Sequence, residues 1–150
     1  MNVLKIEFDK LKADLIAKHQ ELGMEASGDW IKSIEVDATQ TKAILYGNSY
    51  TEQLVNGRAP GKFPPIDAIS KWIIDKDLPL IDITVSSLAF LIARKIAREG
   101  TEYFKQGGTD LIEAVITPER IQSILDKVSE FQINEFVSDI TGVFQNFQAA

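Results

Sequence analysis

Apolar residues recur at three- and four-residue spacing near the start of the chain, which predicts an amphipathic helix over about residues 2–22. The apolar stripe consists of Leu4, Phe8, Leu11, Leu15 and Leu22. Charged residues separate these positions, and Gly23 supplies the end of the helix. His19 lies beside the stripe, so we expect a contact residue at the helix edge and assign it no chemistry.

The pattern then changes to a looser alternation of apolar and polar residues over 30–36 and again over 41–46, which predicts a β-hairpin. Two strands alone are marginally stable in water. We therefore expect this sheet to pack on helices or to gain another strand, including one from a neighbouring subunit. A short helical turn is predicted over 49–55, with its apolar residues facing inward.

Two amphipathic helices are predicted in the middle of the chain. The first begins at Pro65, whose fixed φ suits the first helical position, and ends near Asp75. The second spans about 84–98, and Gly100 is its expected C-cap. The expected inward residues are Ile66, Ile69, Trp72 and Ile73 in the first helix and Leu88, Leu91, Ile92 and Ile96 in the second. Cations favour a helix C-terminus, so helix stabilisation is preferred over ligand binding for the basic cluster there. That cluster is Arg94, Lys95 and Arg98.

Beyond residue 100 the chain is predicted to be mostly helical. Gln106 and the two glycines after it mark a flexible loop, and Thr109 is expected to cap a short helix through Ile116. Thr117 and Pro118 place a cap residue and a first-position proline in sequence, which predicts the start of a longer helix.

The longer helix leaves two alternatives open. Its apolar spacing slips at residues 131–133, where a break in direction or a strand competes with a continuous helix. Its end, from Phe144 to Phe147, is apolar for a free tail, and it packs either against a partner or onto its own core.

Together these elements predict one α+β domain over residues 1–150, with a small antiparallel β-hairpin or sheet packed against several α-helices and a helix-rich C-terminal half. The composition, 45% apolar and 25% charged, is that of a soluble globular protein. The longest apolar runs fall far short of the ~20 residues that cross a bilayer, and residues 1–5 lack the apolar centre of a secretory signal. We therefore expect a cytoplasmic product with no membrane partner.

Motifs for catalysis or metal binding are missing. The chain has no cysteine and one histidine, which excludes disulfides and thiolate chemistry and leaves little material for a zinc site. The run 57–62 resembles a phosphate-binding loop, but three residues separate its glycines where four are required, and Phe63 replaces the magnesium-binding Ser or Thr. The sequence therefore predicts no enzyme, no catalytic residues, no metal and no cofactor.

The net charge of −6 is concentrated in the C-terminal third. Residues 101–150 contain eight acidic and three basic residues, a net charge of −5. Nucleic acid is therefore a poor partner for this part of the chain. A solvated helix face is the favoured interpretation of this excess of negative charge, and a specific binding surface is the alternative.

The loop at residues 57–65 has a tightly specified backbone, because glycines supply turn conformations and each proline restricts the residue before it. The residues that shape it are Gly57, Pro60, Gly61, Pro64 and Pro65. Its remaining large side chains are Arg58, Lys62 and Phe63. Two cations and an aromatic on a stiff frame indicate a partner-contact surface, and a simple rigid connection is the alternative.

The loop and a later segment carry a family resemblance. The run 57–65, Gly-Arg-Ala-Pro-Gly-Lys-Phe-Pro-Pro, and the run 92–97, Ile-Ala-Arg-Lys-Ile-Ala, resemble the neck and tail-component family of long-tailed bacteriophages. That family includes head-tail joining and tail-completion proteins. The resemblance covers about residues 30–104 and fades beyond Gly107, and the chain lacks the Pro-Phe-Leu-Arg-Pro-like segment with which family members end.

The resemblance implies a structural virion protein that forms a homo-oligomeric ring, with a hexamer favoured, in the neck between the portal-connector and the tail tube. Its implied role is head-tail joining, tail completion or tail termination. The implied partners are connector or adaptor proteins and tail tube proteins, and genome DNA could pass through the lumen without sequence-specific binding. The implied location is the virion, after assembly in the host cytoplasm, and no catalytic residues carry over.

A nucleic-acid-binding regulatory protein, of phage or bacterial origin, is the alternative function. Such a protein needs a basic face. The residues available to build one are Arg58, Lys62, Lys71, Arg94, Lys95 and Arg98.

Overall fold

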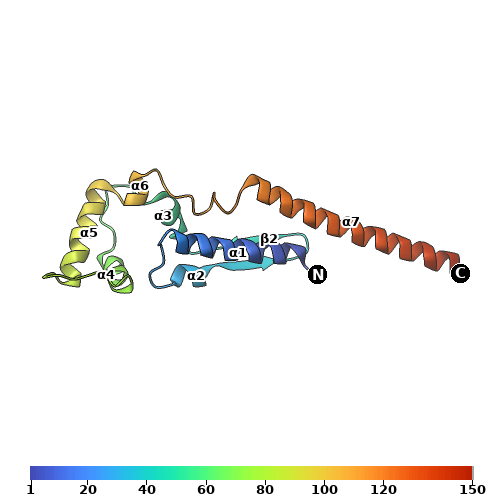
Figure 1. The fold of residues 1–150 in the computed structure, drawn as a ribbon, viewed down its shortest axis with the longest axis horizontal. Coiled ribbons are helices and arrows are strands. Elements are labelled where there is room, and N and C mark those ends of the chain that lie inside the picture. Colours follow the sequence, from blue (N-terminus) through green and yellow to red (C-terminus); the bar gives the residue numbers. More distant parts are fainter. Residues whose placement is uncertain (150) are drawn as a thin grey trace.

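A computed structural model of the chain describes residues 1–149, with side chains through residue 147. The elements in chain order are α1 (Val3–Glu21), α2 (Asp29–Ser33), β1 (Glu35–Ala38), β2 (Ala43–Tyr46), α3 (Thr51–Asn56), α4 (Ile66–Asp75), α5 (Val85–Glu99), α6 (Glu102–Lys105) and α7 (Pro118–Ala149). The molecule is elongated, with α1 and the hairpin in the middle, α4 and α5 at one end, and α7 projecting from the other (Figure 1). The α+β prediction with a helix-rich C-terminal part is confirmed.

The predicted first helix is confirmed, and so is an antiparallel hairpin, although its first strand begins later than predicted. The strands β1 and β2 pair antiparallel, with Glu35 opposite Tyr46 and Ala38 opposite Ala43. The helix α1 packs against both strands. At its start the Asn2 side chain accepts a hydrogen bond from the Lys5 N–H and donates another to the Ala38 carbonyl, so one residue caps the helix and ties it to the hairpin.

The first predicted strand is partly wrong, because residues 29–33 form the short helix α2. Gly28 adopts a φ of 81°, and the Ser27 hydroxyl accepts a hydrogen bond from the Asp29 N–H, which together start a helical turn. One turn of helix places Trp30 and Ile34 on the same side, and both are buried.

The first hydrophobic cluster joins the N-terminal elements to residues 111–124. Its buried members are Leu11, Leu15, Met24, Trp30, Ile34, Leu111, Val115 and Ile124. The predicted short helix through Ile116 is wrong, since Leu111 and Val115 lie in a series of turns. Thr109 does not cap a helix there, because its hydroxyl donates to the Leu54 carbonyl at 2.7 Å and its N–H donates to the Val55 carbonyl at 2.6 Å.

The second cluster packs α4 against α5. Its buried members are Ile69, Ile73, Ala89 and Ala93. The two alanines let the helix backbones approach closely, so the buried stripe is narrower than predicted. Ile66, Trp72 and Leu91, all predicted to face inward, are exposed. The helix boundaries shift by one residue, with Pro65 at the N-cap of α4 and Thr84 at the N-cap of α5.

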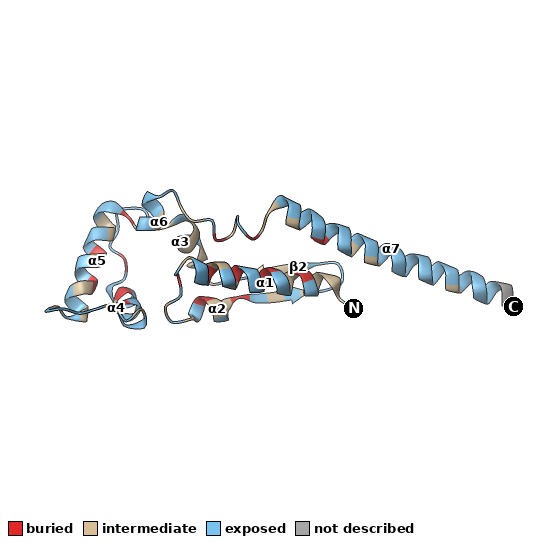
Figure 2. Ribbon diagram, in the orientation of Figure 1, coloured by how far each residue is buried: buried red, intermediate tan, exposed pale blue. Residues whose placement is uncertain are grey.

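The C-terminal helix α7 is continuous over 32 residues, so the predicted break or strand at 131–133 is wrong. The slip in spacing does not interrupt the helix but moves its apolar face to another side. Before the slip, Ile124 is buried and Val128 packs on the first cluster. After it, Phe136 and Phe147 are exposed. Most of the second half of α7 is exposed (Figure 2). The apolar end does not fold onto its own core, and its contact with a partner stays a prediction.

No helix in the described part of the chain combines the length and the apolar character needed to span a bilayer.

Candidate interaction surface

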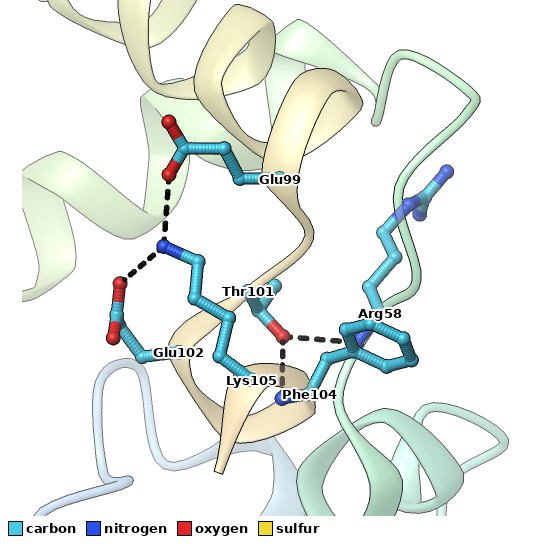
Figure 3. A network of polar contacts seen from close by, with 6 residues as sticks. All are labelled: Arg58, Glu99, Thr101, Glu102, Phe104 and Lys105. Atoms are coloured by element: carbon cyan, nitrogen blue, oxygen red, sulfur yellow. Dashed lines mark hydrogen bonds and ion pairs between the residues drawn. The ribbon is translucent and has the colours of Figure 1, made fainter. Parts of the chain in front are cut away.

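The loop at 57–65 is fastened to the chain that follows α5. The Arg58 N–H donates to the Thr101 hydroxyl at 2.9 Å, and the Thr101 N–H donates back to the Arg58 carbonyl at 3.0 Å (Figure 3). Further along, the Gly61 N–H donates to the Ala97 carbonyl at 2.8 Å. Three backbone-anchored hydrogen bonds therefore hold the loop against the C-terminal end of α5.

Two glycines make this approach possible. Gly57 has a φ of 75°, and a Cβ added to it would lie 2.2 Å from the backbone nitrogen of Phe104. Gly100 has a φ of 80°, and its Cβ would lie 2.8 Å from the carbonyl oxygen of Arg58. Sequence reasoning assigned Gly57 a turn and Gly100 a helix cap, but neither assignment included the contact between the two segments.

The other loop-shaping residues occupy different settings. Pro64 is buried, whereas Pro60 and Pro65 are exposed. Gly61 has a φ of 129° and open space around it, so its conformation and not its size requires glycine.

The predicted contact residues lie on the outside of this junction. The Arg58 side chain points away from the polar network that surrounds Thr101 (Figure 3), and Lys62 is exposed. Phe63 is 52% exposed, and its ring centroid lies 6.0 Å from that of Phe90 on α5. The structure thus exposes Lys62 and Phe63 together and joins Phe63 to α5 by an aromatic contact, whereas Arg58 is half-buried.

The cations of this region have no ion-pair partner among the described side chains, in contrast to Lys105, which binds Glu99 and Glu102 at 2.9 Å each (Figure 3). The hydrogen bond that Lys105 donates to Glu102 contributes most to the raised pKa of Lys105. We define the basic surface as Arg58, Lys62, Arg94, Lys95 and Arg98. Its charges are available to a partner.

A cleft of about 810 Å³ separates α4 and α5 from α2 and the end of α1. Its walls are largely apolar and include Trp30, Tyr50, Leu54, Ile69, Trp72 and Ile96. Lys71 binds Asp75 at 2.7 Å and also reaches Asp29 on α2 at 3.5 Å, and Lys76 donates to the Gly23 carbonyl. Sequence reasoning missed the cleft because its walls come from segments far apart in the chain.

His19 lies beneath one wall of this cleft. Its side chain is 2% exposed, and its ring stacks on Trp30 with centroids 4.4 Å apart. The Nδ1 atom of His19 is buried and has no hydrogen-bond partner among the described residues. Burial lowers the pKa of His19, while nearby Glu25 opposes the shift and Lys76 adds to it. The imidazole is therefore neutral at pH 7.

We expect His19→Phe to remove part of the acid sensitivity of folding. The folded-state pKa of His19 is lower than the unfolded value of about 6.5, so the unfolded chain takes up this proton first as pH falls. Stability from neutral His19 is complete above pH ~6.5 and declines below it. Phenylalanine keeps the stacking on Trp30 without titrating.

Melting temperatures measured from pH 7.5 down to 5 test this expectation. The wild-type melting temperature should fall more steeply than that of the variant over this range. Parallel profiles would show that His19 contributes nothing, because the carboxylates are common to both proteins.

The features described above are exposed aromatic and basic side chains and an apolar cleft. Within the described residues, no three His, Asp or Glu side chains gather in a way that could hold a metal ion. Models of known protein families, curated proteins and solved structures were all compared with the chain, and none of them matches it.

Proposed function

We propose that the protein is a structural virion protein of a tailed bacteriophage and forms a ring, with a hexamer favoured, in the neck between portal-connector and tail tube. Its role there is head-tail joining, tail completion or tail termination. One observation carries the proposal. The two runs that resemble the neck and tail-component family, 57–65 and 92–97, adjoin in space, since the Gly61 N–H of the first run donates a hydrogen bond to the carbonyl of Ala97, the last residue of the second run.

The chemistry of the joined segments supports a partner contact. Phe63 and Phe90 expose aromatic area, and a cation adjoins each of them in the chain, since Lys62 precedes Phe63 and Arg94 lies one helical turn after Phe90 on α5. Aromatic residues and arginine are the side chains most enriched at protein interfaces. The C-terminal third, with its charge of −5, supplies an acidic counter-surface on an adjacent subunit, because heterologous contacts bring different faces of identical subunits together.

We expect the double charge reversal Arg58→Glu with Lys62→Glu to leave the subunit folded but to block ring formation or head-tail joining. Charged residues at an interface hot spot cost ~2 kcal/mol or more when lost, so the yield of infectious particles should fall more than about tenfold. The yield is measured by complementation of a phage that lacks the gene, alongside a thermal melt of each variant.

The matched control is Lys32→Glu with Lys42→Glu, which makes the same charge change at two exposed positions outside the loop. This control should support a normal particle yield. A normal yield from the loop variant would instead leave the loop as a rigid connection. Purified particles that lack the protein would remove the whole proposal.

The basic surface also supports a second candidate, a nucleic-acid-binding regulatory protein. Arg94 and Arg98 lie one turn apart on α5, without ion-pair partners among the described residues. DNA binding by the isolated protein that weakens steeply with salt, and that Arg94→Glu with Arg98→Glu abolishes, would favour this candidate.

A further inference from the structure

The second half of α7 carries an apolar face that nothing covers within the described residues. We define the α7 face as Ile133, Phe136, Ile140, Val143, Phe144 and Phe147, which are between 41% and 80% exposed. Phe136, Ile140, Val143 and Phe147 follow the i, i+4, i+7, i+11 spacing of a helix that inserts into a groove. Monomeric soluble proteins rarely leave so continuous an apolar stripe in water.

The α7 face cannot reach the cleft of its own chain. Arg120 binds Asp14 at 2.6 Å and Lys127 binds Glu7 at 3.1 Å, which fixes the first turns of α7 on α1. From there the helix runs away from α4 and α5 to the opposite end of the molecule (Figure 1). The partner that covers the face therefore belongs to another molecule.

The cleft has the size and chemistry to receive this helix. Its volume of about 810 Å³ is in the range of sites that bury most of a ligand, and its walls are apolar and aromatic. Of the charged residues that line it, Asp29 and Asp75 pair with Lys71, and Glu102 pairs with Lys105. Three lining cations have no ion pair among the described residues, namely Arg58, Lys76 and Lys95. Beyond Lys127 the charged residues of α7 are all acidic: Glu130, Glu135 and Asp139. The two surfaces are complementary in charge as well as in polarity.

We propose that α7 of one subunit inserts its apolar face into the cleft of the next copy of the chain. The helix and the cleft lie at opposite ends of the molecule, so each subunit offers one of each and the contact is heterologous. Thirty-two helical residues span about 48 Å, which is long enough to bridge adjacent subunits. Pairing of α7 with α7 would instead set its acidic residues beside each other.

This contact would hold the proposed ring together, and it rests on the proposed function only for the closure of the assembly into a ring. If the assembly does not close, the same contact builds a filament. The docking itself follows from the two surfaces and is independent of the phage assignment. The docking can therefore be tested on the purified protein alone. A finding that virions lack the protein would contradict the proposed function but not the docking.

Two variants separate the halves of the contact. The helix variant, Phe136→Gln with Phe147→Gln, changes exposed side chains of α7, and the cleft variant, Trp72→Glu, changes a half-exposed wall residue of α4. A third variant, Lys95→Glu, places an acid on the cleft without changing its apolar wall. Ile81→Gln is the matched control, since Ile81 is exposed but belongs to neither surface. Circular dichroism and thermal melts establish that each variant is folded.

Sedimentation velocity over a range of concentrations gives the result. The wild type and the control should assemble into species larger than a dimer, whereas the helix variant and the cleft variant should each associate more than about tenfold more weakly. Lys95→Glu should weaken assembly more at low salt than at high salt. An equal mixture of helix and cleft variants should form a one-to-one dimer, because one intact helix then meets one intact cleft.

Several outcomes would overturn the proposal. Undiminished assembly of both cleft variants would show that α7 pairs with another surface. A mixture that stays monomeric would show that the two surfaces do not meet. Wild-type protein that remains monomeric up to its solubility limit would show that the contact does not form.

Discussion

Replacing Gly57 by alanine should lower the free energy of unfolding by about 2–6 kcal/mol. The first contribution is conformational, since Gly57 has a φ of 75° and a ψ of −173°, a combination that costs an L-residue about 1–3 kcal/mol. The second is steric, because the new Cβ would lie 2.2 Å from the Phe104 nitrogen and 2.7 Å from its Cα, where overpacking adds about 1–3 kcal/mol. The backbone cannot yield there without loosening the Arg58–Thr101 hydrogen bonds.

Gly23→Ala is the control for this effect. Gly23 also has a positive φ, 68°, but an added Cβ meets nothing within 4 Å. The Gly23→Ala substitution should therefore lower the free energy of unfolding only by the conformational contribution, about 1 kcal/mol. Urea unfolding of the two variants measures the difference, and equal losses would mean that the loop and the chain after α5 are not closely packed.

Replacing Ile73 by alanine should unfold α4 and α5 before the rest of the molecule. Ile73 is 1% exposed and packs with Ala89 and Ala93, so the substitution removes a large part of the second cluster. Core Ile→Ala changes typically cost 2–5 kcal/mol. The two hydrophobic clusters share no member among the described residues, which predicts that the loss stays local.

Hydrogen exchange resolved by segment is the measurement. Amides of α4 and α5 should exchange faster in the variant while those of α1 and the hairpin keep their protection. The neighbouring change Ile74→Ala, at a 65% exposed position, should alter exchange little and cost less than about 0.5 kcal/mol. Equal loss of protection in α1 would mean that both clusters unfold as one cooperative unit.

The predictions that the structure confirms rest on strong local patterns. The long stripe of α1 and the cap residues before Pro118 define their helices from neighbouring residues alone. The failures occur where a local pattern fits two structures. A short apolar run such as 30–36 suits a strand or one helical turn, and the choice between them depended on Gly28.

The buried residues of α4 and α5 illustrate a second limit. Leu91 fits an apolar stripe better than Ala89 does, yet Ala89 is fully buried and Leu91 is exposed. Which of these two residues is buried depends on the distance between α4 and α5, and that distance depends on residues of α4 as well as of α5. The same holds for α7, where the slip in spacing at 131–133 indicates a break locally, but the helix continues, with Ile124 buried before the slip and Phe136 exposed after it.

Only part of the candidate interaction surface could be predicted from the sequence. Glycine, proline, aromatic and basic residues sit together in the loop 57–65, so its residues could be identified from the sequence. The cleft could not, because Trp30 and Trp72 approach it from different elements. Nor could the contact between Gly57 and Phe104, which depends on how a segment 47 positions later folds back.

The composition of the first cluster sets an order for folding during synthesis. Leu11, Leu15 and Trp30 are made early, but their partners Leu111 and Ile124 are made much later. The α4–α5 pair is complete long before, and its contacts are close in sequence, which favours fast formation. The middle of the chain can therefore fold on the ribosome while the N-terminal layer still exposes apolar surface, which makes that interval the one most open to aggregation.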